Sequence, residues 1–240
     1  MGAPLQIAHM LYTRLLGLAL LMGAPQHILF IGNSLTYSNN LPATVAAIAA
    51  LDGRRIDVAM VAEPNRALID HLNGESNALQ VLATRKWDVV VLQQGPTTTS
   101  IGRDSLNLWT RMFDPHIRRA GATPALFMSW TPYSRLERTD SAHLSFANAA
   151  AAVKGAFLPV GDAWRIALEL DANLDLYSSD GFHPSELGSY LSALVIYAKL
   201  FNLDPRKLQP TAMNGSKQMK VPQSTVRTLQ RAAFEALSRN

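Results

Sequence analysis

The sequence predicts a three-layer α/β/α sandwich built on a five-stranded parallel sheet. Five short apolar runs alternate with longer stretches of helical periodicity, and this alternation implies a parallel sheet covered by helices on both faces. The length of 240 residues suits one large α/β domain, and a hydrophobic content of 48% supplies a full core. Charged residues make up only 17% of the chain, which argues against a disordered protein.

The five predicted strands are the apolar runs, among which DVVVL is the clearest buried one. They are expected at His27–Ile31, Ile56–Val61, Asp88–Leu92, Ala125–Trp130 and Ala156–Val160. In open parallel sheets, ligands bind at the carboxyl ends of the strands. Functional residues are therefore expected in the segments that follow these runs.

Helices are predicted where apolar residues recur at helical spacing, as Val226, Leu229 and Ala233 do near the C-terminus. They are expected at Pro42–Leu51, Ala67–Arg85, Asp104–Ala120, Ser141–Lys154, Glu186–Phe201 and Gln223–Ser238. The segment Pro205–Pro222 contains Pro, Gly, Asn and Ser and is expected to link the last helix to the core. No internal repeat interrupts this pattern, so residues 25–240 are predicted to form a single domain.

The N-terminal segment has the features of a signal peptide. Arg14 precedes the apolar run Leu15–Met22, which is too short to span a bilayer but has the length of a signal-peptide core. Residues 1–24 are therefore interpreted as a signal peptide or an N-terminal extension. A signal peptide predicts a periplasmic or secreted protein, and its absence a cytoplasmic one. No stable membrane insertion is expected in either case.

Composition disfavours several function classes. The chain has 22 Lys and Arg against 18 Asp and Glu, and the resulting charge of +4 is mild. The basic residues near the C-terminus have no interleaved aromatic residues, so a solvated surface is expected rather than a nucleic-acid partner. Cysteine is absent, which excludes disulfides and a cysteine nucleophile. No histidines have metal-ligand spacing and no dinucleotide or P-loop motif occurs, so neither a metal nor a cofactor is predicted.

A serine follows the first predicted strand directly, in the segment GNSLT that begins at Gly32. A serine between a buried strand and a helix is presented at the carboxyl edge of the sheet, and Gly32 relieves crowding at the turn. The next helix contributes N–H groups and its positive dipole end there. Ser34 is therefore a candidate nucleophile, although the same segment is also a good helix-capping sequence.

The base that a serine nucleophile needs is expected in the downstream segment SDGFHP, residues 179–184. A histidine has the right pKa to take the serine proton, and a carboxylate orients it. Asp180 and His183 are three residues apart in a loop and can meet around one turn, and Pro184 starts the next helix. This pattern favours catalysis over a structural role for the histidine.

Together the two segments resemble the SGNH hydrolases, a family also called GDSL-like. Gly32-Asn33-Ser34 resembles the family's nucleophile block, usually Gly-Asp-Ser, and Asp180-Gly181-Phe182-His183 resembles its final Asp-x-x-His block. The resemblance implies a flavodoxin-like fold and a serine ester hydrolase without a cofactor, in which Ser34 attacks, His183 is the base and Asp180 orients it. It also implies small acyl esters as substrates, including acetyl groups on carbohydrates, with lipid or thioester substrates elsewhere in the family. An exported location favours a glycan or cell-envelope ester.

The family's two other blocks, whose Gly and Asn supply oxyanion-hole donors, are altered in this chain. After the second strand the expected Gly is missing from VAEPNRA, and Asn65 is the best replacement because asparagine tolerates the left-handed conformation. After the third strand, LQQGP replaces Gly-x-Asn-Asp and is similar to a subgroup that carries Gln there. A Gln amide has the same donor as Asn on a longer arm. The predicted oxyanion donors are the backbone N–H groups of Ser34 and Asn65 and the side chain of Gln93, or else Gln94; alternatively, both amides only tie down the loop.

Two rival functions and two local questions stay open. The altered blocks motivate a non-catalytic glycan-binding module on the same fold, and an acyltransferase would use the same triad.

Asp162, after the fifth strand, either lines the site or, as we prefer, caps the next helix. Trp130, Tyr133 and Trp164 follow strand ends and form either an aromatic wall for a sugar or acyl group or part of the core.

Overall fold

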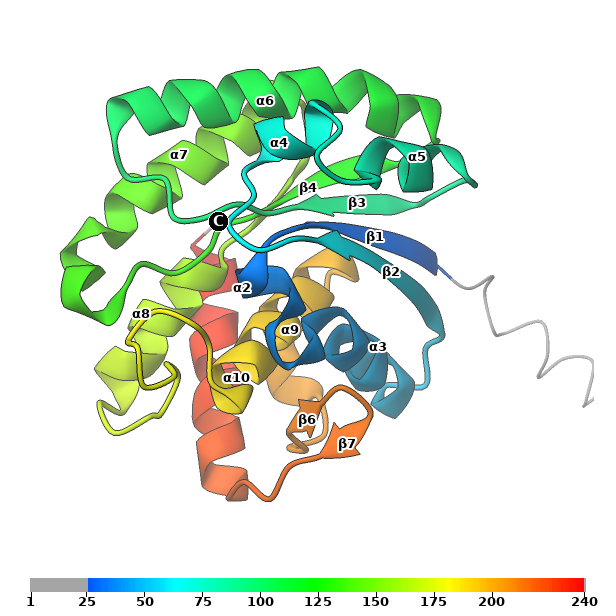
Figure 1. The fold of residues 1–240 in the computed structure, drawn as a ribbon. Coiled ribbons are helices and arrows are strands. Elements are labelled where there is room, and N and C mark those ends of the chain that lie inside the picture. The colour runs from blue at the N-terminus through cyan, green and yellow to red at the C-terminus, as the bar shows by residue number, and fades with distance from the viewer. Residues whose placement is uncertain (1–25, 240) are drawn as a thin grey trace, which may run out of the picture.

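The computed structural model describes residues 26–239 and has a five-stranded parallel sheet between two layers of helices (Figure 1). The strands lie in the order β2-β1-β3-β4-β5, and every pairing among them is parallel. They are β1 (Gln26–Gly32), β2 (Ile56–Ala62), β3 (Val89–Leu92), β4 (Thr123–Phe127) and β5 (Ala156–Leu158). The predicted fold class is confirmed, whereas the signal peptide or extension predicted at residues 1–24 lies outside the described residues.

Alternate strand residues face opposite sides of the sheet and form two hydrophobic cores. In β1, Ile28 and Phe30 are fully buried on one side, and Leu29 and Ile31 are fully buried on the other. Because both faces are covered, the inner strands are apolar throughout. This is why they appear in the sequence as continuous apolar runs.

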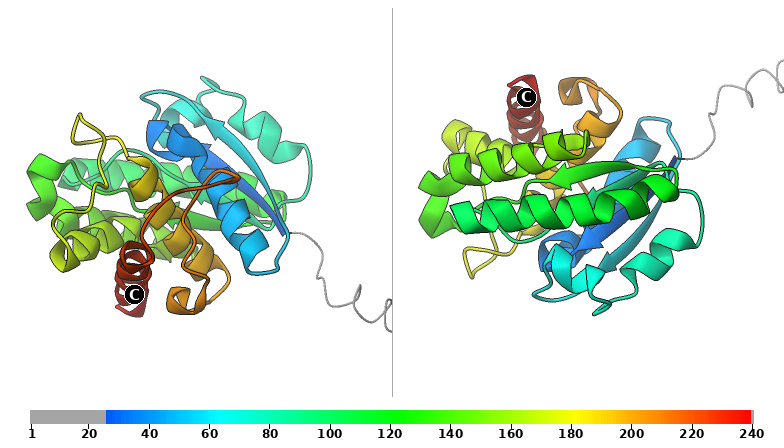
Figure 2. Two further views of the ribbon diagram at one scale, coloured as in Figure 1. Left: turned by 90° about the horizontal axis from the view of Figure 1, so that it is seen from below. Right: turned by 90° about the horizontal axis from the view of Figure 1, so that it is seen from above.

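Each face of the sheet is covered by its own layer of helices (Figure 2). The layer over Ile28 consists of α3 (Leu41–Leu51), α8 (Val160–Leu170), α9 (Glu186–Leu200) and α10 (Gln223–Ser238). The layer over Leu29 consists of α4 (Leu68–Leu72), α5 (Ala78–Ala83), α6 (Ser100–Arg119) and α7 (Thr139–Ala152). The short elements between them are α2 (Ser34–Tyr37), η1 (Ser38–Asn40), η2 (Tyr133–Arg138) and η3 (Pro205–Lys207).

The prediction of one helix over Ala67–Arg85 is wrong, because the chain forms α4 and α5 with a turn between them. Gly74 lies in this turn with φ +85°, a left-handed conformation that residues with a side chain rarely adopt. The Ser76 hydroxyl accepts a hydrogen bond from the N–H of Ala78, the first residue of α5, at 3.2 Å. The break therefore has a local cause, and it ends α4 one residue after His71.

The segment 205–222, which the sequence predicts as a linker, contains a small hairpin. In it, β6 (Met213–Asn214) pairs antiparallel with β7 (Lys217–Gln218). The N–H of Gly215 donates to the Thr44 hydroxyl of α3 at 2.7 Å, which anchors the hairpin to the helical layer. In the part of the chain that the structure describes, no helix has the length and hydrophobicity needed to cross a bilayer.

Candidate active site

Ser34 is the first residue of α2, directly after β1 and the N-cap Asn33. As the first helical residue, it has a backbone N–H with no acceptor inside the helix. The chain turns here in a crowded place: a Cβ at Gly32 would lie 2.4 Å from Gln93 Oε1 and 2.5 Å from Thr36 Oγ1. Glycine at position 32 therefore allows Gln93 to approach the turn that presents Ser34.

Asn33 holds this turn through both its backbone and its side chain. Its N–H donates to Gln93 Oε1 at 2.9 Å, and its side-chain amide donates to the carbonyl of Arg66 at 2.9 Å. Its side-chain oxygen accepts from the N–H of Leu35 at 3.2 Å, as the helix N-cap. The same Asn33 contacts that cap the helix therefore also fix the turn that presents Ser34.

His71 also contacts the end of β1, a role that the sequence analysis missed. Its side chain is fully buried, with Nε2 3.0 Å from the Gly32 carbonyl oxygen and Nδ1 2.7 Å from the Ser76 hydroxyl. A carbonyl can only accept, so Nε2 carries the hydrogen and Nδ1 accepts from Ser76. Burial lowers the pKa of the His71 imidazole, which keeps the ring neutral. No sequence signal links His71 to Gly32, 39 residues earlier.

Asp180 and His183 lie in a tight turn before α9. Gly181 has φ +68°, and the N–H of Ser178 donates to the His183 carbonyl at 2.8 Å, which closes the turn. Asp180 Oδ1 accepts from the Ser178 hydroxyl at 2.7 Å. It also accepts from the N–H groups of Phe182 and His183, each at 2.9 Å. The aspartate is therefore fixed by its own turn.

Ser34, His183 and Asp180 form one line of hydrogen bonds. Nε2 of His183 lies 3.0 Å from Ser34 Oγ, and Nδ1 lies 2.6 Å from Asp180 Oδ2. The Nδ1–H donates to the carboxylate, so Nε2 keeps a lone pair for the serine proton. Hydrogen bonds from the His183 ring, the Ser178 hydroxyl and the backbone hold the pKa of Asp180 well below its usual range. The structure thus brings the three predicted residues together with an ionised carboxylate at one end.

Two residues after β4 hold the Asp180–His183 turn in place. The indole N–H of Trp130 donates to the Phe182 carbonyl at 2.9 Å, and the backbone N–H of Tyr133 donates to the Gly181 carbonyl at 2.9 Å. Trp130 is buried and stacks on buried Trp164, with ring centroids 3.8 Å apart. Of the three aromatic residues considered for a substrate wall, Trp130 and Trp164 therefore belong to the core, whereas Tyr133 is 58% exposed.

Gln93 and Gln94 follow β3 and make different contacts. Gln93 Oε1 accepts from the Thr36 hydroxyl at 2.7 Å as well as from the nucleophile turn, whereas its buried Nε2 has no hydrogen-bond partner within residues 26–239. Gln94 uses both ends: Oε1 accepts from the Leu68 N–H at 3.2 Å, and Nε2 donates to the Thr97 hydroxyl at 3.1 Å. Gln94 therefore ties down the loop, and Gln93 keeps an unused donor.

Asn65 lies in the turn after β2 and has φ +58°, the left-handed conformation expected for it. The neighbouring Arg66 carbonyl accepts from the side chain of Asn33, so this turn lies beside the nucleophile turn. Among the described residues, no hydrogen bond from the backbone N–H of Asn65 is found. The N–H of Asn65 is thus an unused donor close to the residue that precedes Ser34.

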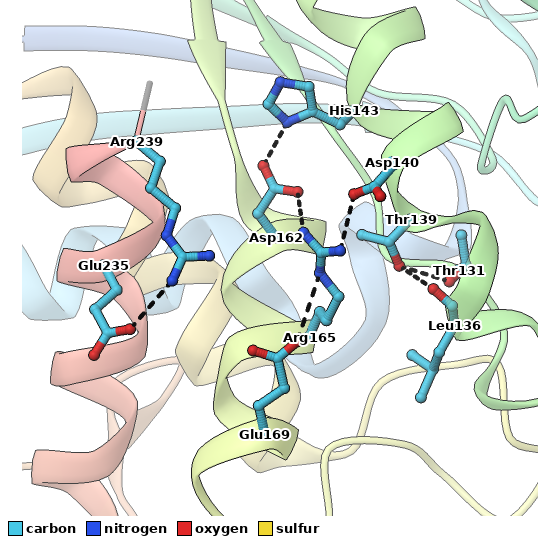
Figure 3. Close-up of polar contacts among 10 residues, drawn as sticks. All are labelled: Thr131, Leu136, Thr139, Asp140, His143, Asp162, Arg165, Glu169, Glu235 and Arg239. Atoms are coloured by element: carbon cyan, nitrogen blue, oxygen red, sulfur yellow. Dashed lines mark hydrogen bonds and ion pairs between the residues drawn. The ribbon is translucent and has the colours of Figure 1, made fainter.

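Asp162 belongs to a separate polar cluster on α7 and α8 (Figure 3). The prediction that it caps the next helix is wrong, because the N-cap of α8 is Pro159 and Asp162 lies inside the first turn. Its carboxylate lies 2.7 Å from Nδ1 of His143 and 4.0 Å from Arg165. Within residues 26–239 no hydroxyl is hydrogen-bonded to the other ring nitrogen of His143, so this pair is not a second triad.

The polar groups of the site are suited to nucleophilic attack with proton transfer. Ser34 supplies a hydroxyl, His183 a proton acceptor and Asp180 a fixed negative charge. In the part of the chain that is described, no group of three or more His, Cys, Asp or Glu side chains could hold a metal ion.

Comparison with solved structures finds several proteins with a similar fold. A proposed SGNH hydrolase from Slackia heliotrinireducens is 27% identical with a TM-score of 0.61, and the match covers 74% of this chain and 100% of that chain. A DUF4886 family protein from Bacteroides uniformis is 17% identical with a TM-score of 0.71, over 90% and 95% of the two chains. A lipase/acylhydrolase from Enterococcus faecalis is 17% identical with a TM-score of 0.57, over 78% and 100%.

These structural neighbours show that the chain has the fold of the SGNH and GDSL hydrolases, with its parallel sheet and flanking helices. No protein-family model and no curated protein matches the sequence. What the neighbours share with this chain is thus an architecture, and its chemistry depends on the residues of its own site.

Proposed function

We propose that this chain is a serine ester hydrolase of the SGNH type that acts on small acyl esters. The proposal is carried by the hydrogen-bonded line from Ser34 through His183 to Asp180, with separations of 3.0 and 2.6 Å. This line lies past the end of β1, at the edge of the sheet where ligands of such folds bind. The structural neighbours, which include a lipase/acylhydrolase and an esterase, support the same reaction class.

The proposed reaction is a double displacement. His183 Nε2 takes the proton of Ser34 as Oγ attacks the ester carbonyl, and the ionised Asp180 stabilises the imidazolium that forms. The bond to the alcohol then breaks, and His183 returns the proton to the leaving oxygen. In the second half, a water molecule gives a proton to His183 and attacks the acyl-enzyme. The carboxylic acid leaves as Ser34 regains its proton.

Three donors are proposed to stabilise the oxyanion: the backbone N–H groups of Ser34 and Asn65, and Nε2 of Gln93. The unpartnered Nε2 of Gln93 supports this assignment. A buried donor without an acceptor costs about 1–3 kcal/mol, and it gains an acceptor when charge develops on the substrate oxygen. In this proposal the chain belongs to a subgroup of these hydrolases in which Gln after the third strand replaces the usual Asn.

The proposed substrates are acyl esters, acetyl esters among them, on carbohydrate or cell-envelope molecules. The exposure of the triad supports a large alcohol portion, because the side chains of His183 and Asp180 are 41% and 49% exposed. An ester on the surface of a glycan can reach such a site without a deep channel. The signal-peptide features of residues 1–24 suit an envelope substrate.

Hydrolysis of p-nitrophenyl acetate tests the proposed function. The Ser34→Ala protein should lose this activity and keep a near-normal urea midpoint, whereas Ser38→Ala, a control in the next turn, should keep both. A fluorophosphonate should label Ser34, as read by mass spectrometry. A folded Ser34→Ala protein that keeps most of the activity contradicts the assignment. A wild-type protein that hydrolyses no ester but binds glycans would be a binding module.

A further inference from the structure

A cavity of about 340 Å³ lies between η2 and the C-terminal part of α8. It is lined by Tyr133, Leu136, Arg165, Leu168, Glu169 and Ala172, and we call it the Tyr133 pocket. One of these residues touches the turn that carries Asp180 and His183, because the N–H of Tyr133 donates to the carbonyl of Gly181 at 2.9 Å. The volume is within the usual range of small-molecule sites, roughly 300–1,000 Å³.

The aromatic wall of this pocket is an exposed ring in a fixed orientation. Tyr133 is 58% exposed, and Tyr177 packs edge-on against it, with ring centroids 5.6 Å apart and an interplanar angle of 74°. Tyr177 is itself fixed, because it is buried and its hydroxyl donates to the Thr131 carbonyl at 2.8 Å. A rigid aromatic residue supplies contact area at a low cost in conformational entropy.

The polar wall consists of Arg165 and Glu169, one turn apart on α8 (Figure 3). Arg165 donates to Asp140 at 2.8 Å, and its guanidinium lies 4.0 Å from both Asp162 and Glu169. A separation of 4.0 Å is too long for a hydrogen bond. Glu169, with a side chain 60% exposed, therefore keeps its oxygens available for hydroxyl groups of a ligand.

The charges at the pocket disfavour an anionic ligand. Of the two charged residues that line the pocket, Glu169 is negative, and the guanidinium of Arg165 is already paired with Asp140, which lies outside the pocket. An acyl chain could pack on Leu136 and Leu168, but it is disfavoured because it would cover the Glu169 carboxylate without offering it a hydrogen-bond donor. A sugar ring fits both walls, since it has an apolar face for the tyrosine and hydroxyl groups for the charged pair.

We propose that the Tyr133 pocket binds a neutral sugar ring of the substrate, separate from the unit that carries the ester. This inference rests on the proposed ester hydrolase function and specifies its substrate class as acylated oligosaccharides or polysaccharides of neutral sugars. The backbone contact between Tyr133 and Gly181 places the bound ring next to the catalytic turn. The pocket thereby sets which part of a glycan chain reaches Ser34.

The test compares substrates with and without a sugar chain, on the full-length protein. The substrates are p-nitrophenyl acetate and chemically acetylated tetrasaccharides of glucose, xylose, galactose and mannose. Tyr133→Ala, read against Tyr133→Phe, and Glu169→Gln should each raise KM for the preferred tetrasaccharide by about tenfold. In the described part of the chain, Glu169 has no hydrogen bond or ion pair with the catalytic turn, so Glu169→Gln should leave p-nitrophenyl acetate hydrolysis unchanged. Tyr133→Phe should behave as wild type, because stacking needs the ring. Leu108→Ala on α6, 56% exposed and outside the pocket, is the matched control.

A binding assay separates failure of this inference from failure of the proposed function. Ser34→Ala protein is titrated calorimetrically with the unacetylated tetrasaccharides, so the result does not depend on catalysis. Binding that Tyr133→Ala abolishes supports the pocket even if no ester is hydrolysed. The inference is overturned if no tetrasaccharide binds, or if Tyr133→Ala leaves tetrasaccharide binding and KM unchanged. It is also overturned if Tyr133→Ala instead changes the chain-length preference among p-nitrophenyl acyl esters.

Discussion

Nε2 of His71 donates a hydrogen bond to the carbonyl oxygen of Gly32, at a distance of 3.0 Å. Gly32 is the last residue of β1 and stands two positions before Ser34, so this contact ties α4 to the turn that presents the serine. The imidazole is fully buried, and burial lowers its pKa from the ordinary value of 6.5. The contact therefore couples the stability of the fold to pH.

We predict that the wild-type protein loses stability faster than a His71→Gln variant as the pH falls below about 6.5. In that range the unfolded chain binds a proton at His71 and the folded chain does not, so protonation favours unfolding. The contribution of neutral His71 to the free energy of unfolding is complete above the pKa that His71 has in the unfolded chain. Below that pKa the contribution falls by at most about 1.4 kcal/mol per pH unit. Urea midpoints of both proteins between about pH 5 and 8 measure it. If the urea midpoints of the two proteins changed in parallel with pH, protonation of His71 would not contribute to the loss of stability.

The fold and the turn that carries Asp180 and His183 could be predicted because their signals are local. The apolar runs identify the strands, and Asp180 and His183 stand three residues apart in one turn. The pairing of Ser34 with His183, 149 residues later, is expected only from the resemblance to the hydrolase family. The contact of His71 with Gly32 could not be predicted, because it depends on the break between α4 and α5 that the periodicity conceals. Likewise, Gln93 and Gln94 are neighbours of the same type, and only tertiary contacts distinguish them.

Gly32→Ala should impair both activity and stability. The new Cβ would lie 2.4 Å from Gln93 Oε1, which would push that side chain away from the backbone of Asn33. Overpacking of this kind typically costs about 1–3 kcal/mol, and displacement of the nucleophile turn should lower kcat. Urea unfolding and p-nitrophenyl acetate kinetics give the two values. Gly95→Ala is a suitable control, since nothing lies within 4 Å of a Cβ there. Normal kcat in Gly32→Ala would mean that Gln93 does not position the turn.

Measured from about pH 5 to 8, kcat/KM should show one rise with increasing pH, because a histidine base has to lose its proton before it can accept another. His183 must be neutral to take the serine proton. Asp180 should add no inflection in this range, because its hydrogen bonds hold its pKa well below the usual range and keep it ionised. Asp180→Asn should lower kcat by roughly a hundredfold or more. A rate that is constant across the whole range would exclude a histidine base.

Activity should survive exhaustive treatment with EDTA. The proposed steps use only Ser34, His183 and Asp180 together with hydrogen-bond donors, and none needs a Lewis acid. The measurement is the rate of p-nitrophenyl acetate hydrolysis after chelation and gel filtration, with and without added divalent metals. Activity that is lost on chelation and restored by one metal would contradict the proposed mechanism.

The two glutamines after β3 should differ in their effects on catalysis. The tetrahedral intermediate carries charge that the ester carbonyl lacks, so a donor aimed at it acts mainly on the transition state. Gln93→Ala should therefore lower kcat by roughly a hundredfold or more, with little change in KM. Gln94→Ala should do far less, because both ends of that side chain are already bonded to Leu68 and Thr97.

A third variant separates the donor of Gln93 from its role in the nucleophile turn. Gln93→Ala also removes Oε1, which accepts hydrogen bonds from Asn33 and Thr36. Gln93→Glu keeps an oxygen at that place and puts a second carboxylate oxygen, which cannot donate, where Nε2 was. If Nε2 holds the oxyanion, Gln93→Glu should be as slow as Gln93→Ala. Recovery of kcat in Gln93→Glu would instead restrict Gln93 to positioning the turn. Near-normal kcat in all three variants would remove glutamine from the mechanism, and the oxyanion would then rest on the backbone donors of Ser34 and Asn65.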